Sequence, residues 1–192
     1  THLYLVTSAS TARSGQVWRS PIPAIDGTGL AWTKIFDLTG FTTTLAGGID
    51  GGVGSYFREQ CFATDGTVAF VVEYGGTVTG GPSVYYTASV TSGSMLWTKR
   101  KTWANGKHAH SVKLIGAIPW VMIGDAGSTD LGLWRGTPNG GTWTQASIYG
   151  EDAGGTTLYG INIVPVTIDG HPLILTESDT KRGHSVLSFN SQ

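Results

Sequence analysis

The stretch LWRGTPNGGTWTQ, residues 133–145, decides the fold. It begins with an apolar and aromatic run, continues through a polar turn with a Gly-Gly pair, and resumes with Trp and Thr. Residues of high β-propensity on both sides of a glycine turn are typical of a β-hairpin. Related units recur along the chain, so the hairpin is one part of an internal repeat.

Each copy of the repeat combines up to four predicted strands, named A to D in chain order. The D strands open with Trp32-Thr33, Trp97-Thr98 and Trp143-Thr144. The C strands occupy residues 17–20, 84–87, 133–136 and 186–189. The B strands occupy 3–7, 68–74, 120–125 and 173–177, and the A strands 56–63, 108–115 and 159–168. Successive C strands lie about 50 to 70 residues apart, near the length of a propeller blade.

This repeat predicts an all-β fold, a β-propeller of four-stranded antiparallel blades in an incomplete ring of about 3.5 blades. No segment carries an apolar stripe of helical period, and Gly-Gly pairs interrupt the chain too often for helices. We assign residues 1–192 to a single propeller portion. Its blades span 1–38, 56–103, 108–150 and 159–192, and residues 39–55 form a Gly-rich loop.

The first predicted blade lacks strand A and the last lacks strand D, so the blades hold three, four, four and three strands, 14 in all. The smallest propellers have about four complete blades, so this number does not close an ordinary ring. Two explanations stay open. The chain is a portion of a longer protein, which we favour, or several copies combine to complete the ring.

Composition excludes several classes of partner. Charged residues make up 13% of the chain and the net charge is −1, so there is no basic field to attract nucleic acid. No apolar run approaches the roughly 20 residues of a membrane span. The one cysteine, Cys61, excludes an intrachain disulfide, and its alternating surroundings predict a small buried hydrophobe.

The turn at residues 135–143 resembles the Asp box of sialidase-like (BNR-repeat) propellers. Asn139 stands where that motif has aspartate, and one residue is missing before Thr142-Trp143. The turns at 21–31 and 88–96 keep the Trp and little else. The resemblance implies a propeller in which Trp32, Trp97 and Trp143 are equivalent, buried and structural. The arginine triad and Tyr–Glu pair of the sialidases have no match here, which disfavours sialidase activity.

In a propeller, the starts of A strands and the ends of B strands surround the mouth of the channel. A concave site with convergent polar groups is the default binding site. We therefore predict ligand-binding residues at these strand ends, and they are Tyr56, Arg58, Glu73, Tyr74, Tyr159 and Glu177. Glu59, Asn162 and Asp179 occupy similar places.

His108-Ala109-His110 is the sharpest candidate for chemistry, together with Asp125. Residues i and i+2 of a strand share one side, so both imidazoles face one ligand, and the end of the adjacent B strand brings Asp125 near. Three readings stay open: polar residues bonded to backbone at a strand start, an acid–base or glycan-contact site, and a metal site, for which zinc is the usual ion. No other cofactor is expected.

Glu73, Asp125 and Glu177 close successive B strands. Carboxylates in such positions serve either as a general acid and base or simply as solvated strand ends. The function expected first is glycan recognition by an extracellular or virion-associated propeller, such as part of a secreted protein or a phage tail. The alternatives are a glycan-cleaving hydrolase or lyase, and a structural or protein-binding propeller.

Overall fold

The computed structural model describes residues 2–8, 15–38, 57, 60–74, 81–92, 95–104, 108–124, 130–147, 160–169, 171–178 and 184–188. Within these ranges the regular elements are all β-strands, and they form four antiparallel sheets. Sheet 1 contains β1 (His2–Thr7), β2 (Gln16–Pro21) and β3 (Thr33–Asp37). Sheet 2 contains β4 (Phe62–Thr64), β5 (Ala69–Val72), β6 (Ser83–Thr87) and β7 (Thr98–Thr102). Sheet 3 contains β8 (His108–Ile115), β9 (Ile118–Gly124), β10 (Gly132–Gly136) and β11 (Trp143–Ser147). Sheet 4 contains β12 (Gly160–Ile168), β13 (His171–Ser178) and β14 (His184–Ser188).

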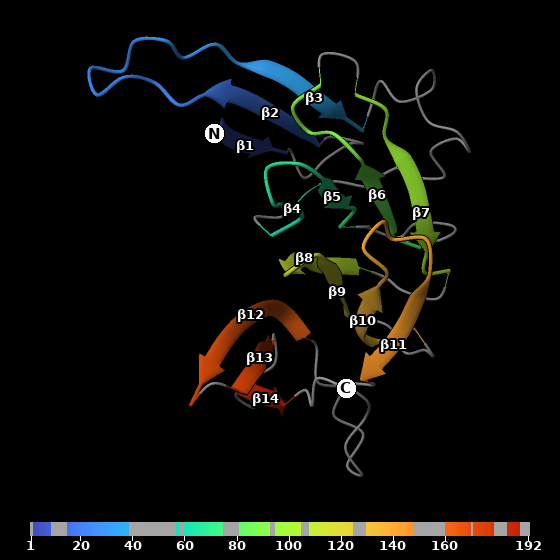
Figure 1. Ribbon diagram of the computed structural model, residues 1–192. Coiled ribbons are helices and arrows are strands. Elements are labelled where there is room, and N and C mark those ends of the chain that lie inside the picture. Colours follow the sequence, from blue (N-terminus) through green and yellow to red (C-terminus); the bar gives the residue numbers. More distant parts are fainter. Residues whose placement is uncertain are drawn as a thin grey trace.

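Strand order follows chain order in every sheet, so each sheet is an antiparallel meander. The described strands number three, four, four and three from sheet 1 to sheet 4, which confirms the predicted all-β fold and its strand count. The sheets follow one another along an open arc and do not close into a ring (Figure 1). β4 and β8 lie towards the hollow side of this arc, and β7 and β11 lie on the opposite side.

The A strand of sheet 2 is shorter than predicted. We expected residues 56–63, whereas β4 spans Phe62–Thr64. The backbone just before β4 bonds to two sheets: Gln60 O accepts from Val112 N at 2.9 Å, and Cys61 O accepts from Val72 N at 2.9 Å. Because β8 and β5 share these bonds, the segment does not continue one regular ladder.

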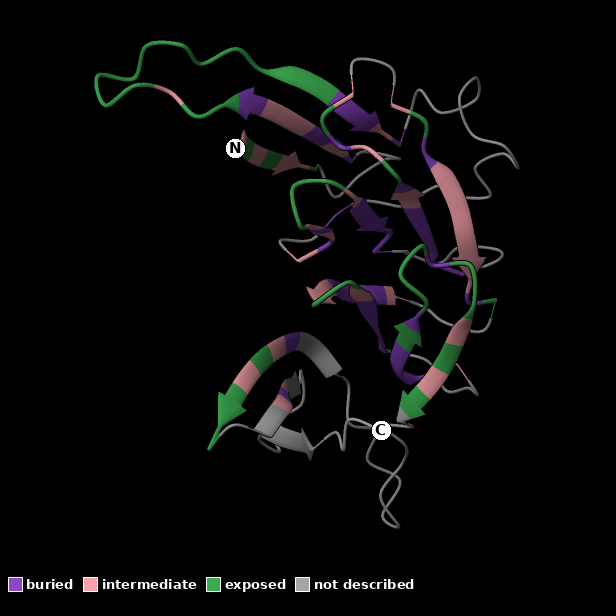
Figure 2. Cartoon of the chain, viewed as in Figure 1, coloured by how far each residue is buried: buried purple, intermediate pink, exposed green. Residues whose placement is uncertain are grey.

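The core lies between successive sheets. Phe36 of sheet 1 packs on two rings of sheet 2, with its centroid 5.5 Å from Tyr85 and 4.9 Å from Trp97. A second cluster joins sheets 3 and 4 through Met122 and Ile163. Buried residues concentrate in β5, β6 and β9 (Figure 2). Cys61 is a buried free cysteine, as predicted, with an exposed fraction of 0%.

The predicted equivalence of three tryptophans is wrong in one case. Trp97 is 2% exposed and its Nε1 donates to Ile35 O of sheet 1 at 2.8 Å. Trp143 is half-buried and its ring centroid lies 5.5 Å from that of Trp103. Trp32, by contrast, is 41% exposed. Trp97 and Trp143 each pack on the sheet that precedes their own.

The turn between β10 and β11 holds itself together through Asn139 and Thr137. Asn139 Oδ1 accepts from Gly141 N at 3.0 Å, and Thr137 Oγ1 accepts from Thr142 N at 3.2 Å. Gly140 has a φ of 66°, which favours glycine. The Trp143 Nε1 donates to Gly140 O at 2.7 Å, so the turn and the tryptophan form one unit.

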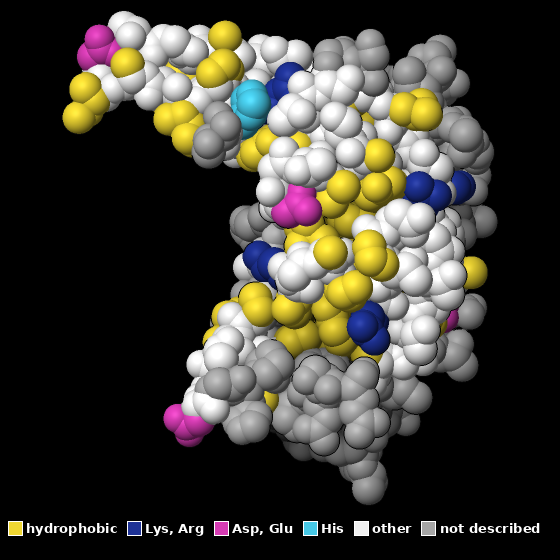
Figure 3. Space-filling view, viewed as in Figure 1, with side chains coloured by type: hydrophobic (Ala, Val, Ile, Leu, Met, Phe, Trp, Pro, Cys, Tyr) yellow, Lys and Arg dark blue, Asp and Glu magenta, His cyan; other side chains and the backbone are white. Residues whose placement is uncertain are grey.

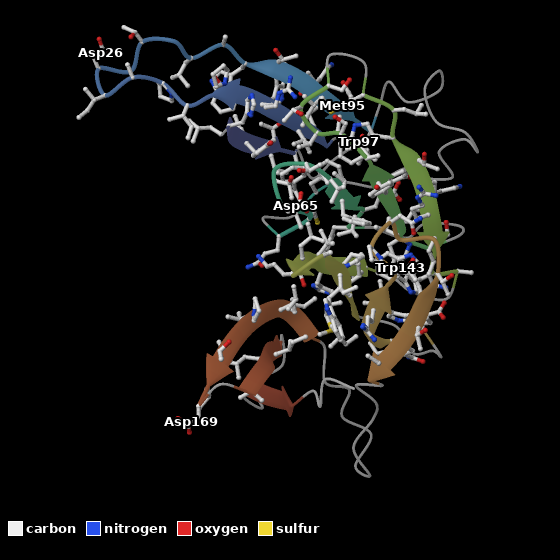
Figure 4. All side chains as sticks on the ribbon, in the orientation of Figure 1. Asp26, Asp65, Met95, Trp97, Trp143 and Asp169 are labelled. Carbon is white, nitrogen blue, oxygen red and sulfur yellow. The ribbon has the colours of Figure 1, made fainter. Side chains whose placement is uncertain are left out.

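The hairpin between β2 and β3 also has an acidic side chain that bonds to the turn at its tip, although this turn keeps little of the Asp-box sequence. Asp26 Oδ1 accepts from the backbone and side chain of Thr28, at 2.9 and 2.7 Å. These bonds lower the pKa of Asp26. Figure 4 shows Asp26 at the end of a projecting arm, well away from Asp65 and Asp169 in the β4–β5 and β12–β13 turns.

Candidate functional site

Three rings meet where sheet 2 faces sheet 3. His108 stacks on Tyr74, with ring centroids 4.2 Å apart and an interplanar angle of 9°. His110 stands edge-on to Tyr74, at 5.2 Å and 88°, and to His108, at 5.7 Å and 83°. Tyr74 and His110 are each 7% exposed, and His108 is half-buried. Tyr74, His108 and His110 are called the ring cluster below.

Backbone contacts bring the end of β5 to the start of β8. Tyr74 lies two residues beyond β5, and His108 is the first residue of β8. Between them, Ala109 N donates to Glu73 O at 3.3 Å, and Cys61 Sγ donates to Ala109 O at 3.9 Å. The ring cluster therefore joins residues that were predicted to line the mouth from two different blades.

A β-bulge sets the angle between the two imidazoles. Ala109 pairs with Ile123 and Ser111 pairs with Met122, which leaves His110 as the extra residue of β8. A bulge bends its strand and changes the direction of a side chain. The histidines meet as predicted, but their rings are perpendicular and their common neighbour is Tyr74 of sheet 2.

Glu73 precedes the ring cluster in the chain and is 0% exposed. Its Oε1 accepts a hydrogen bond from the hydroxyl of Tyr85, and its backbone N–H donates to Ser83 O at 3.0 Å. A buried carboxylate is costly unless polar groups satisfy it. We predicted Glu73 as a ligand-binding residue, and this stays a prediction; the structure shows its side chain completely buried.

Tyr85 was not predicted as a site residue, because residues 84–87 have the pattern of an apolar strand. Its ring is fully buried and its hydroxyl reaches Glu73. The available signal was general: a tyrosine at a core position usually has a hydrogen-bond partner for its hydroxyl. Because Glu73 ends the neighbouring strand, it was the acidic residue within reach.

Several predicted site residues lie outside the described part of the chain. These are Tyr56, Arg58, Glu59, Asp125, Tyr159 and Asp179. For Glu177 and Asn162 the backbone is described and the side chain is not; the two residues pair with each other in the β12–β13 ladder. The chain just before Asp125 is placed, since Gly124 ends β9 opposite His108.

A metal site at His108, His110 and Asp125 stays a prediction. Among the described residues, no group of three or more His, Cys, Asp or Glu side chains is arranged to hold a metal ion. Asp125 is not among those residues. The ring cluster offers two imidazoles, which bind zinc in proteins only with further ligands.

Comparison with known proteins does not assign this chain to a family. No protein-family model matches the chain, and no curated protein matches it. Among solved structures, a mutant of the α-L-arabinanase of Cellvibrio cellulosa aligns with 97% of this chain and 69% of its own, at 11% identity and a TM-score of 0.34. A similarity of this size carries no argument about fold or activity.

The described residues contain no helix long and apolar enough to cross a membrane.

Proposed function

We propose that this chain is part of a β-propeller that recognises a glycan outside the cell or on a virion surface. The observation that carries the proposal is the ring cluster, in which one tyrosine and two imidazoles from neighbouring sheets converge at the strand ends. Aromatic faces and hydrogen-bonding side chains suit saccharides. The low content of charged residues, 13%, fits an uncharged ligand.

The propeller itself is supported by three features taken together. Four meanders follow one another in chain order. β4 and β5 contact β8, and β8 and β9 contact β12, so sheet 2 meets sheet 3, and sheet 3 meets sheet 4, through their early strands. In the turn at residues 137–143, Asn139 Oδ1 accepts hydrogen bonds from Thr137 Oγ1 and Gly141 N, which supports the predicted resemblance to an Asp box.

Within the ring cluster, His108 is the group that reaches solvent. Its ring is stacked on Tyr74 and half-buried, so its orientation is fixed before a ligand arrives. A preorganised ring loses little conformational freedom on binding. His110, at 7% exposure, supports the ring of His108 from the side.

An array of neutral and uronate-containing oligosaccharides tests the proposal, followed by calorimetric titration of the best sugar. We expect His108→Ala to weaken binding at least about tenfold while the Tm changes little. His2→Ala is the matched control, because His2 lies on β1 outside the ring cluster. Absence of any glycan binding, or equal binding by both variants, would reject the proposal.

A glycan-cleaving enzyme is the second candidate, favoured by the two imidazoles of His108 and His110 that meet in the ring cluster. An acid and a base held in different environments are what glycoside cleavage requires. The test is release of reducing ends, or of unsaturated products, from the polysaccharide that the array identifies. Turnover that His110→Ala abolishes supports the enzyme, and binding without turnover supports the binder.

A further inference from the structure

The D strands of sheets 1, 2 and 3 each contain a β-bulge at the same position. In sheet 1 the register shifts on β3 and leaves Ile35 as the extra residue. The equivalent shift leaves Arg100 as the extra residue of β7 and Ala146 as the extra residue of β11. Because the bulge recurs at one place in the repeat, the side chains at this place can be compared between sheets.

In sheet 1 the bulge supplies two apolar side chains to the junction with sheet 2. Ile35 is 7% exposed and Phe36 is 2% exposed. The ring of Phe36 packs on Tyr85 and Trp97 of sheet 2. Apolar residues at these two positions are therefore enough to join one sheet to the next.

Sheet 2 has two cations at the equivalent positions, Arg100 and Lys101, and both face sheet 3. Lys101 Nζ lies 4.6 Å from the centroid of the Trp134 ring on β10. Arg100 Cγ lies 3.3 Å from the place that a Cβ would take at Gly140, in the β10–β11 turn. Both side chains are half-buried. Since sheet 1 makes the same kind of junction with apolar residues, packing alone does not account for the two charges.

Aromatic rings fix the positions of these cations. Arg100 Cζ lies 4.8 Å from the centroid of the Tyr86 ring, and Lys101 Nζ lies 5.6 Å from that of Trp103. A guanidinium group that stacks on a ring keeps the N–H donors at its edge, and these match the two oxygens of a carboxylate or sulfate. The charged groups are thus oriented by packing before an anion arrives.

The acidic residue that pairs with a cation in sheet 1 has no counterpart in sheet 2. Lys34 of β3 forms a salt bridge with Asp37. By the strand register, Thr102 occupies the position of Asp37 in sheet 2. Within the part of the chain that the structure describes, neither Arg100 nor Lys101 forms a salt bridge, and Arg100 Nε is buried with no hydrogen-bond partner.

We propose that Arg100 and Lys101 form a binding site for an acidic saccharide, whose carboxylate or sulfate group neutralises both cations. Trp143 of β11 is half-buried and lies in contact with Trp103, with ring centroids 5.5 Å apart, so an indole surface for the sugar ring lies beside the charges. Figure 3 shows Lys and Arg side chains over β7, on the side of the arc away from the hollow.

This site contains no residue of the ring cluster, and the proposal does not depend on that cluster. Nucleic acid is a less suitable ligand, because it binds to extended basic surfaces and the net charge of this chain is −1. A pair of cations beside an indole fits a single acidic sugar better than a long phosphate backbone.

Dextran sulfate oligosaccharides and unmodified dextran of the same length test the proposal, because the two probes differ only in their sulfate groups. We expect calorimetric titration of the 192-residue chain to show binding of dextran sulfate that unmodified dextran does not displace. Lys101→Met and Arg100→Gln should each weaken this binding at least about tenfold. Lys113→Gln is the matched control, since it removes the same charge from β8, and it should bind as the wild type does.

Circular dichroism and thermal melting establish that each variant is folded. Lys101→Met keeps an apolar side chain against Trp134, so it decides the matter alone if Arg100→Gln does not fold. Equal affinity of the wild type and Lys101→Met for dextran sulfate overturns the proposal. An equal loss in Lys113→Gln also overturns it, because net charge would then govern the binding. Displacement of dextran sulfate by a single-stranded oligonucleotide at equal concentration of charge would assign the site to polyanions in general and reject a saccharide site.

Discussion

Sheets 1 and 2 are built from the same repeat, yet one exposes the tryptophan that the other buries. Trp32 is 41% exposed and Trp97 is 2% exposed, although both stand at the start of a D strand. The difference is not local, because turn and strand are present in both. It comes from the neighbour: Trp97 rests on Ile35 and Phe36 of sheet 1. Burial in this fold is a property of the junction between sheets.

The largest effect expected is at Trp97. Trp97→Ala should lower the free energy of unfolding by about 3–5 kcal/mol, as for a large aromatic residue in a core. Trp143→Ala should cost less, because Trp143 is half-buried, and Trp32→Ala under about 1 kcal/mol. Urea denaturation of the three variants measures this order. Equal losses at Trp97 and Trp32 would show that the junction does not decide their roles.

Tyr85 of sheet 2 and Trp18 of sheet 1 occupy equivalent positions of the repeat. Their side chains differ in polarity as well as in burial. Tyr85→Phe removes a donor to the buried carboxylate of Glu73, so a loss of about 1–3 kcal/mol is expected. Tyr86→Phe, at the half-buried next position, should change stability by about 0.5 kcal/mol or less. The midpoints of denaturant unfolding of Tyr85→Phe and Tyr86→Phe measure this difference. If both substitutions cost the same, the Glu73 bond contributes nothing to stability.

The turns of sheets 1 and 3 offer a smaller contrast. Gly27 and Gly140 both have positive φ, 81° and 66°. A side chain at Gly27 meets nothing within 4 Å, whereas a Cβ at Gly140 would lie 3.0 Å from the ring of Phe70 in sheet 2. Gly27→Ala should cost about 1–2 kcal/mol from backbone strain, and Gly140→Ala should cost more. The reverse order in thermal melts would contradict the packing of this turn on sheet 2.

The smallest effect concerns Lys113 on β8. Burial lowers the pKa of Lys113 below the usual value for lysine. Folding therefore penalises the charged form, fully at neutral pH and less as the pH rises through the folded-state pKa. Lys113→Met should raise the Tm slightly at neutral pH, and the gain should shrink in alkaline buffer. A gain that does not depend on pH would assign the effect to packing instead.

Much of the fold could be predicted from the sequence because the same structural unit recurs in four copies. The B strand at residues 120–125 and β9, Ile118–Gly124, nearly coincide, since strong alternation and the Trp-Thr marker recur at similar spacing. Trp32 was misjudged for the opposite reason. A local pattern says which side chain faces a junction, but it does not say whether anything lies across that junction.

The candidate site was less predictable. His108 and His110 were predicted from their spacing, and Tyr74 from its place at a strand end, and the structure shows the three rings in contact. The stacking of His108 on Tyr74 joins two sheets, so it does not follow from the pattern of one strand. The β-bulge at His110 was not predictable either, because no residue typical of a bulge, such as glycine, marks it in the sequence. The burial of Glu73 depends on Tyr85, whose partner across the sheet was not apparent from the chain alone.

Because each sheet touches chiefly its neighbours, stability here is a sum of contributions from successive junctions, as in repeat proteins. Among the sheets that the structure describes, sheet 2 has a junction on each side, with sheets 1 and 3, and sheet 1 has a junction with sheet 2. Sheet 1 should therefore open by itself, at a lower free energy than global unfolding, and exchange its backbone amides early. Backbone amides of β1 and β2 should lose their protection against hydrogen exchange before those of β5 and β6. Unfolding would then begin at sheet 1.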